Sequence, residues 1–592
     1  MEGSPAEQTS SLRGGSGTSP SPDAIAWGLL GLSLLVHLLL VPARGWERDL
    51  YWFATWMRTS LEAGAAHVAD KVWCDYPPGY IYLLETVGFL WKLFTRGDLP
   101  PDSSLAMRFL LKLLPITADL SGAWALYRIA LPRLGRISAL LVLSGYAFNP
   151  AMIFNSALWG QADSVLSLLL ILSFWALCSR RSAAAFALLA AAILVKFQAV
   201  VLLPVFLLGA LSLQGPEGIR AAYRGSGWTS LALLLPFFWA QRVETVIQRA
   251  FGAVGRYPFI SMNAHNVWWL VGRESSPRTS DAMRIGNAFL TYHTIGFAMF
   301  ALASFLVLWK LWSGLRGPRA EKEAVIAEAA ALQVLAFYLF PTEMHERYIV
   351  PALVFLAVLC VWKPLAWWLY GVASAAVFFS LASTLNANYP DHVGPLGQLF
   401  PPGREDALLL SGFFIMLFGL LLLWGAHPRF LLLAPLSAAG LAVLLGGVSK
   451  AGVKSPQGLC EWEPVEERQD WGERHRDRTV DANRLSVDGF IFRHGIGTHA
   501  RSRLTYHLNG AFSALDTAFG IDDEANKGQR IRFRILADGQ VRYDSGDVTV
   551  LGFPYHATVD VRKTSFLTLE VLDGGDGINS DHADWLEPVL FR

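Results

Sequence analysis

Four long uncharged stretches place the strongest constraint on what this chain can fold into. No Asp, Glu, Lys or Arg occurs in residues 137–161, 364–390, 407–426 or 430–449. Each stretch is long enough to cross a hydrocarbon core of ~30 Å as a single helix. Only 16% of the chain is charged and 53% is hydrophobic, whereas ordinary globular domains are roughly 25% charged. We therefore expect an integral membrane protein.

Shorter apolar segments extend this pattern between residues 23 and 450. With the uncharged stretches, they predict a polytopic α-helical membrane domain of about 12 to 13 transmembrane helices. The expected spans are 24–41, 80–95, 105–127, 138–156, 164–178, 183–213, 227–241, 287–309, 324–340, 347–362, 365–386, 407–425 and 430–449. We expect 183–213, which contains Lys196 and Pro204, to be two short or broken helices. Residues 1–22 are rich in Ser, Gly and Pro and predict a disordered tail.

The composition changes at about residue 451. Residues 451–477 predict a linker, which is rich in charge from residue 461 onward, whereas 478–592 alternate apolar and polar residues between Gly- and Asp-rich turns. Ile531, Phe533 and Ile535, for example, alternate with arginines. This period of two is typical of strands with one buried face, and predicts a C-terminal all-β sandwich.

The basic residues of the short loops predict the orientation in the membrane. Arginines and lysines lie at 180–181, 220–224 and 310–322, and such connections are usually cytoplasmic. The expected span count then places residues 44–79, 243–285 and 387–405, together with the C-terminal domain, on the periplasmic or extracellular side of the plasma membrane. The net charge is +1, and no dense basic tract predicts a nucleic-acid partner.

Polar side chains gather at the ends of several spans, where charge at membrane depth usually marks function. Asp49 follows the first span among aromatic residues, and such a carboxylate can accept a proton from a hydroxyl group. Solvated charge in an interfacial aromatic belt is the alternative. Asp75 precedes two prolines, which also explain it as part of a rigid helix start.

Later clusters add an amide and several cations. Gln161 and Asp163 follow Asn155, and Lys196 lies with Gln198 in an apolar segment, where it can instead reach an interface. His345 and Arg347 can hold a phosphate. Alternatively, Glu343 and Arg347, four residues apart, can pair in a capped helix start. Together the clusters suit transfer from an anionic lipid-phosphate donor, with a base on the acceptor and cations on the departing phosphate.

The order of these motifs resembles the C-type superfamily of membrane glycosyltransferases. It is closest to transferases that use dolichyl-phosphate glucose or mannose, and to their bacterial mannosyltransferase relatives. The similarity covers roughly 45–450. The matching features are Asp49, the Asp-Tyr-Pro-Pro run at 75–78, Asn149-Pro150 with Gln161, and His345-Glu346-Arg347 with Pro351. This chain has Arg347 where the family has Lys, and Trp159-Gly160 before Gln161 where it has His-Phe.

The resemblance implies roles for the polar residues. Asp49 would be the general base with Asp75 beside it. His345 and Arg347 would lie near the donor phosphate. In addition to what the resemblance implies, we expect Lys196 to bind the donor phosphate, and Gln161, Asp163 and Glu346 to bind substrate. These enzymes are inverting and use neither a metal nor a cofactor, so the expected partners are a polyprenyl-phosphate sugar, a glycan or lipid-linked acceptor, and the bilayer.

The C-terminal domain resembles the NPCBM-type carbohydrate-binding module of glycoside hydrolases, a galactose-binding-like or jelly-roll sandwich. The matching runs are Gly495–Ala500, Asp573–Ile578 and Asp581–Trp585. The expected glycan-binding residues are His499, Asp576, Asp581, Asp584 and Trp585. The alternative for these residues is that they close the sandwich core.

Both resemblances point to glycans. The sequence therefore predicts an inverting hexosyltransferase that uses a polyprenyl-phosphate donor on the outer face of the membrane and carries a glycan-binding module. A transporter or flippase of a lipid-linked glycan, or a non-catalytic glycan receptor, are the alternatives. Transporters often contain inverted repeats, and the chain shows no evident internal repeat.

Overall fold

The computed structural model describes most of the chain between Pro22 and Phe591. Described are residues 22–72, 74–251, 259–272, 276–277, 279, 281, 291–317, 319–389, 392–393, 406–423, 457–487, 490–492, 494–525, 529–549 and 554–591. The expected tail and the expected span at 430–449 lie outside these residues.

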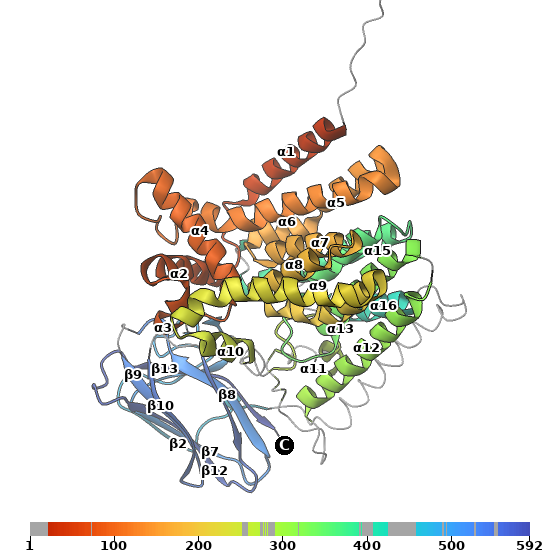
Figure 1. Cartoon of the computed structure of the whole chain (residues 1–592). Coiled ribbons are helices and arrows are strands. Elements are labelled where there is room, and N and C mark those ends of the chain that lie inside the picture. Colours follow the sequence, from red (N-terminus) through yellow and green to blue (C-terminus); the bar gives the residue numbers. More distant parts are fainter. Residues whose placement is uncertain are drawn as a thin grey trace, which may run out of the picture.

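The part of the structure up to residue 423 is a helical domain (Figure 1). Its first half consists of α1 Pro22–Leu40, α2 Glu47–Ala63, η1 Ala65–His67, α3 Val68–Lys71, α4 Pro78–Thr95, α5 Leu105–Ala147, α6 Pro150–Ile153, η2 Phe154–Trp159, α7 Asp163–Cys178 and α8 Ser182–Val195. Its second half consists of η3 Phe197–Leu202, α9 Leu203–Trp239, α10 Val243–Phe251, α11 Trp268–Gly272, α12 Tyr292–Gly314, α13 Arg319–Leu339, η5 Glu346–Ile349, α14 Val350–Leu359, α15 Ala366–Asn388 and α16 Asp406–Leu423.

The described helices agree with the expected spans. Six of the described helical segments are long and apolar enough to cross a membrane, and two of these are continuous stretches of 55 and 43 residues that contain breaks. In α5 the break is Gly135, with φ of 73°, and in α9 it is Gly215, with φ of 63°. Segment 183–213 is interrupted at Lys196, whose extended backbone separates α8 from η3. The prediction of broken helices there is confirmed.

The C-terminal domain is a sandwich of two antiparallel sheets with its own core. One sheet has the order β11-β8-β13-β6-β3, with β1 also on β13, and the other has the order β10-β9-β12-β7-β2. The strands are β1 Gln457–Gly458, β2 Glu466–Gln469, β3 His475–Arg476, β6 Gly495–His499, β7 Ser502–His507, β8 Ala514–Ile521, β9 Arg530–Ala537, β10 Gln540–Thr549, β11 Tyr555–Asp560, β12 Phe566–Asp573 and β13 His582–Phe591, with a separate pair β4 Ser486–Val487 and β5 Phe490–Ile491. A helical membrane domain with a C-terminal β-sandwich is therefore confirmed.

The expected linker differs from the structure in one respect. Residues 457–476 contribute β1, β2 and β3, which pair with β13, β7 and β6. β2 and β3 are edge strands, and edge strands tolerate the charged side chains that made this segment resemble a linker.

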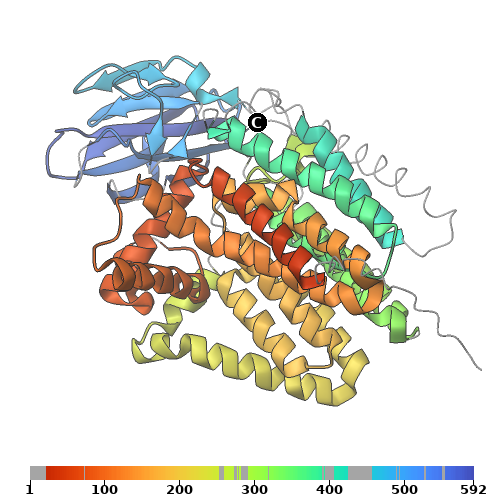
Figure 2. The same ribbon diagram turned by 90° about the horizontal axis from the view of Figure 1, so that it is seen from above.

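The two domains meet at the end of the helical domain that carries α3 and α10 (Figures 1 and 2). There the Phe259 ring, in the segment between α10 and α11, packs edge-on against the His556 ring of β11 at a centroid distance of 5.5 Å. The Phe259 carbonyl accepts a hydrogen bond from the backbone N–H of Glu343 at 3.0 Å. The β domain thus touches a segment that is bonded to the loop before η5.

Candidate active site

Asp49 lies in the first turn of α2 and is hydrogen-bonded to Gln161, a second residue of the predicted site. The Gln161 side-chain amide donates to Asp49 Oδ2, and Gln161 itself is fully buried. Local backbone irregularity aims Gln161 there, because η2 is a π-helical segment that ends at Gly160 in the left-handed region, with φ of 87°. The Asn155 carbonyl accepts from the N–H groups of both Gly160 and Gln161, at 3.1 and 2.9 Å. Such π-helical turns occur frequently at functional sites.

Packing fixes the start of α2 against η2. The Trp46 ring stacks on Trp159 with centroids 5.1 Å apart and planes 4° from parallel. Lys112 of α5 is buried, and its ammonium group donates to three backbone carbonyls on both sides of this contact: Val41 at 3.1 Å, Ala43 at 2.7 Å and Leu158 at 2.9 Å. Asp49 is therefore held on a rigid support.

Lys196 and Asp163 form a buried ion pair at the break between α8 and η3. Lys196 Nζ lies 2.7 Å from Asp163 Oδ1, and the two side chains are 8% and 0% exposed. The ammonium group also lies 5.6 and 5.7 Å from the ring centroids of Tyr76 and Tyr348, within cation–π distance. Lys196 therefore points inward, so the alternative in which it reaches a membrane interface does not hold.

Asp75 is brought to the same place by the start of α4. A Cβ at Gly79 would lie 2.6 Å from the Leu194 carbonyl oxygen, so only glycine allows α4 to begin this close to the end of α8. The Asp75 carboxylate acts electrostatically on Tyr76 and Tyr348, the two rings that face Lys196. The two prolines at 77 and 78 thus start the helix and also position Asp75.

His345, Glu346 and Arg347 lie at the start of η5. Arg347 Nη1 donates to Glu346 Oε1 at 3.0 Å, with Glu346 1% exposed. The Arg347 Nε has no hydrogen-bond partner among the described residues. Glu343 lies beside His293 instead, at 3.6 Å, so the pairing of Glu343 with Arg347 considered from their spacing is not formed.

The predicted residues of the helical domain converge on one cluster. The carboxylates that act on the Arg347 charge are those of Asp49, Glu346 and Asp163. Cations that act on His345 include those of Arg347 and Lys196. The Asp49 carboxylate, in the first turn of α2, therefore lies near the charges of Arg347 and Lys196, and His345 lies near the same two cations. The sequence did not indicate that the rings of Tyr76 and Tyr348 lie beside Lys196, although each tyrosine directly follows a predicted site residue.

The predicted glycan-binding residues of the β domain do not share one environment. Trp585 is fully buried, with its ring 5.2 Å from Phe533 and 5.6 Å from Phe519. Asp584 is also fully buried, and burial and the Asp522 carboxylate hold its pKa well above the usual range. The expected sugar contacts of these two residues are therefore corrected. The Trp585 ring closes the core between the sheets, and Asp584, the preceding residue, faces the other side of β13, where it is buried beside Asp522.

His499 lies instead beside an exposed aromatic ring. The Trp471 ring, 49% exposed, lies 4.8 Å from the His499 ring and 6.0 Å from His582. Asp581 is buried next to His582, and burial with the nearby carboxylates raises the pKa of Asp581 to about 7. Asp576 is exposed in the turn before β13. Trp471 escaped sequence reasoning because it lies in the segment that was expected to be a linker.

Taken together, the described residues form a helical domain, with six segments long and apolar enough to cross a membrane, and a separate β-sandwich. Residues 457–591 match the NPCBM/NEW2 domain, in agreement with the predicted C-terminal module, and residues 77–318 match the GPI transamidase subunit PIG-U family.

Individual relatives resemble one domain or the other. An alpha-1,3-galactosidase B of Akkermansia muciniphila is 31% identical over 123 residues, which are 20% of this chain and 16% of that enzyme. This chain therefore spans less than a fifth of that relative's length. A CBM51 domain of Clostridium perfringens, solved with methyl-galactose, is 30% identical and covers 23% of this chain and 99% of its own, with a TM-score of 0.22. ArnT of Cupriavidus metallidurans, solved with undecaprenyl phosphate, is 19% identical over 73% of this chain and 77% of its own, with a TM-score of 0.39.

Proposed function

We propose that the helical domain transfers a hexose, with inversion, from a polyprenyl-phosphate donor to a glycan, lipid or protein acceptor on the outer face of the membrane. The observation that carries the proposal is the cluster in which the Asp49 carboxylate, bonded to Gln161, lies near Lys196 and Arg347. A single displacement at a sugar carbon requires a base for the acceptor and an anion-binding group for the leaving phosphate.

In this proposal the reaction is one step. The acceptor hydroxyl oxygen bonds to the anomeric carbon while the bond between that carbon and the donor phosphate oxygen breaks. Asp49 takes the hydroxyl proton, and the leaving polyprenyl phosphate keeps the bonding electrons. Arg347 and Lys196 then stabilise the added negative charge, for which Arg offers a planar fork of donors. The Gln161 amide fixes the Asp49 carboxylate so that one oxygen remains free for the acceptor.

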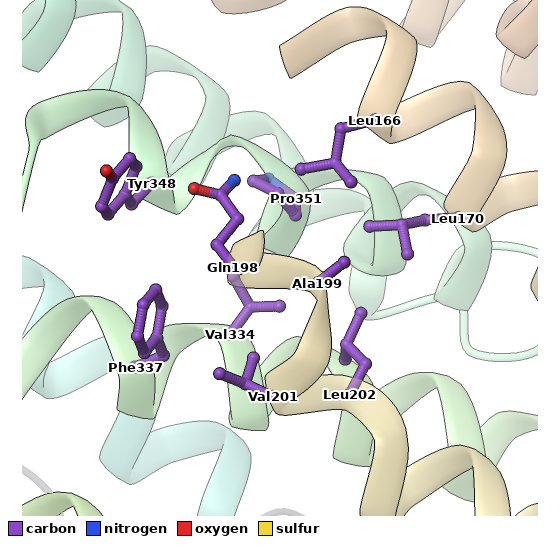
Figure 3. A pocket seen from close by; sticks show the side chains of 10 residues that line it. All are labelled: Leu166, Leu170, Gln198, Ala199, Val201, Leu202, Val334, Phe337, Tyr348 and Pro351. Atoms are coloured by element: carbon purple, nitrogen blue, oxygen red, sulfur yellow. The ribbon is translucent and has the colours of Figure 1, made fainter. Parts of the chain in front are cut away.

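An apolar pocket beside this cluster suits the lipid part of the donor. Gln198 and Tyr348, whose ring lies 5.7 Å from the Lys196 ammonium group, are among the residues that line the pocket (Figure 3). Its lining is otherwise largely aliphatic or aromatic: Leu166, Leu170, Ala199, Val201, Leu202, Val334, Phe337 and Pro351. In this proposal the isoprene unit next to the phosphate packs against this apolar lining.

Mass analysis of products formed from polyprenyl-phosphate hexoses tests the transferase. We expect Asp49→Asn to reduce turnover at least about 10²-fold, the lower range for loss of a general base. Glu47→Gln is the matched control, because Glu47 lies in the same turn of α2 but is 53% exposed. Full turnover in the Asp49 variant would remove Asp49 from the mechanism. Movement of the intact lipid-linked sugar without cleavage would instead favour a flippase.

We propose that the β domain binds glycan at Trp471, His499 and His582 rather than at Trp585. The exposed indole ring of Trp471 can stack on a sugar face, and the buried rings of His499 and His582 pack beside it. Residues 457–592 can be tested alone on glycan arrays, since their core is formed within this segment. Trp471→Ala should abolish binding while the fragment stays folded. Equal binding by this variant would rule out the proposed surface.

A further inference from the structure

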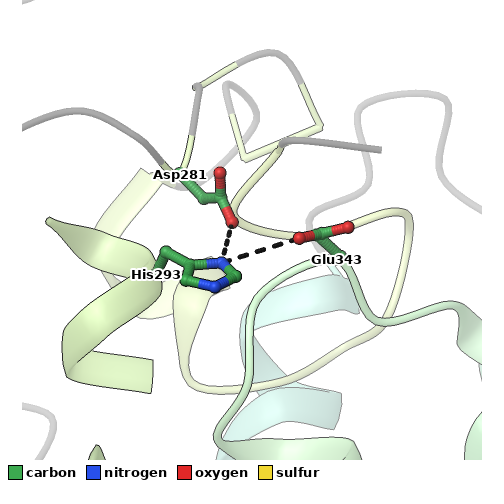
Figure 4. A group of neighbouring side chains, drawn as sticks. All are labelled: Asp281, His293 and Glu343. Carbon is green, nitrogen blue, oxygen red and sulfur yellow. Dashed lines mark hydrogen bonds and ion pairs between the residues drawn. The ribbon is translucent and has the colours of Figure 1, made fainter. Parts of the chain in front are cut away.

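Three side chains that can bind a metal ion converge outside the proposed transfer site. Asp281 comes from the segment before α12, His293 from the first turn of α12 and Glu343 from the loop before η5. His293 Nδ1 lies 2.8 Å from Asp281 Oδ2 and 3.6 Å from Glu343 Oε1. One ligand atom from each residue lies within 4.8 Å of the others, and Figure 4 shows all three pointing toward one point.

Charge and burial favour a cation at this point. The Asp281 and Glu343 side chains are 5% and 8% exposed. Two buried carboxylates are costly unless positive charge accompanies them. His293 can bring at most one positive charge, and then only when protonated. A divalent ion bound to neutral His293 would instead make the cluster neutral.

The donor atoms point to zinc. One imidazole nitrogen and two carboxylate oxygens are ligands that Zn²⁺ binds, whereas Mg²⁺ and Ca²⁺ prefer oxygen ligands alone. Metal–ligand distances of ~2.0–2.2 Å in a tetrahedral site place ligand atoms roughly 3.4 Å apart. The observed separations of 2.8 and 3.6 Å lie on either side of this value. His293 is 34% exposed, which leaves a side open for ion entry and a water ligand.

A neighbouring hydroxyl group is hydrogen-bonded to one of the proposed metal ligands. Thr342 Oγ1 donates to Asp281 Oδ2 at 2.6 Å, and ligating carboxylates are commonly oriented by such a hydrogen bond. Glu343 has a backbone φ of 64°, a conformation that residues other than glycine seldom adopt. A bond from its carboxylate to a metal would help to keep the loop in that conformation.

We propose that Asp281, His293 and Glu343 bind one Zn²⁺ ion that ties three segments of the outer surface together. Its ligand Glu343 is two residues before His345, so the ion would hold in place the loop that carries His345 and Arg347. It would take no part in sugar transfer, so the expectation of metal-independent chemistry at Asp49 stands beside it. The inference does not rest on the proposed function, because its tests measure bound metal and stability.

Metal content of the purified full-length protein in detergent is the first test. We expect about one zinc ion per chain, as for a three-residue site with one water ligand, and its loss in His293→Asn and Glu343→Gln. His507→Ala is the control, because His507 is an exposed histidine of β7. Asp481, Glu524 and His582 form a second group of suitable ligands in the β domain. Zinc that disappears in His582→Asn but persists in His293→Asn would overturn the proposal.

Two further measurements guard against variants that fail to fold. In the wild-type chain, a chelator should lower the melting temperature and added Zn²⁺ should restore it. His293→Cys replaces the imidazole by a thiolate, which is also a zinc-site ligand. Its cobalt form should show a thiolate-to-cobalt charge-transfer band that the wild-type chain lacks. A wild-type chain that holds no zinc after purification and does not gain stability with added Zn²⁺ would refute the site.

Discussion

Replacing Lys196 by methionine would remove one half of a buried ion pair while keeping most of its volume. The partner carboxylate of Asp163 is 0% exposed and lies 2.7 Å from the ammonium group. Without that group it would remain as an uncompensated buried charge, which costs about 3–5 kcal/mol. We expect the melting temperature in detergent, followed by tryptophan fluorescence, to fall by several degrees or more.

An exposed ion pair of the same length is the matched control. Arg58 Nη2 also lies 2.7 Å from Asp102 Oδ1, but these side chains are 32% and 38% exposed. Arg58→Met should therefore cost at most about 1 kcal/mol. A Lys196→Met variant as stable as Arg58→Met would show that burial does not set the energy of the pair, and would refute the reasoning.

The double variant Asp163→Leu with Lys196→Met separates stability from function. Apolar residues in place of a buried ion pair are often neutral or stabilising, so the melting temperature should recover to near the wild-type value. Sugar transfer should not recover, because the proposed role of Lys196 is to stabilise the leaving phosphate. A stable double variant with full turnover would assign Lys196 a structural role alone.

Three further outcomes follow from local geometry. Gly160→Ala places a Cβ 2.8 Å from Leu50 Cδ2 in a left-handed backbone conformation, and should lower turnover by roughly 10²-fold through misplacement of the next residue, Gln161. Trp585→Ala should destabilise the fragment 457–592 by about 3–5 kcal/mol in urea denaturation, because the ring is fully buried. Burial and the Asp576 carboxylate raise the pKa of Asp581 to about 7. The folded fragment therefore keeps a proton that the unfolded chain loses near pH 4, and its stability should fall as the pH rises from about 4 to 7, by about 1–2 kcal/mol. Asp581→Asn should remove that slope.

The membrane helices could be predicted because their signal is local. A run of apolar residues reports its own length, and the breaks also follow from single residues, as when Lys196 stands inside an apolar segment. The ends of α4 are equally local, since Pro78 starts the helix and Thr95 precedes charged residues. Contacts between segments are a different matter. Nothing in the spacing of Glu343 and Arg347 shows that Glu343 lies beside His293 instead.

The tryptophans of the β domain show the same limit. Alternation reveals that a strand has two faces, but it does not show which face is covered by the opposite sheet. Trp585 stands in a motif with polar neighbours, which favours a surface position, whereas Phe519 of the neighbouring strand β8 and Phe533 of the opposite sheet enclose it. Trp471 stands among charged residues, in a segment whose composition predicts a linker and not a binding surface. Its position beside His499 depends on the pairing of edge strands with the sandwich, which sequence alone does not reveal.

Because the two domains are in contact, the candidate active site and the β domain must lie on the same side of the membrane. Phe259 packs on His556 of the β domain and is bonded to the loop before His345, so the candidate active site and the β domain lie at the same end of the helical domain. A label on either one therefore locates both. Val541 is 51% exposed on β10, whereas three of the four native cysteines are buried and the fourth, Cys178, is half-buried. In cells that express the chain, Val541→Cys should react with a membrane-impermeant maleimide before the cells are opened, because short basic loops predict the opposite end to be cytoplasmic. Reaction only after permeabilisation would place the β domain and Asp49 together on the inner face, and would refute transfer on the outer side.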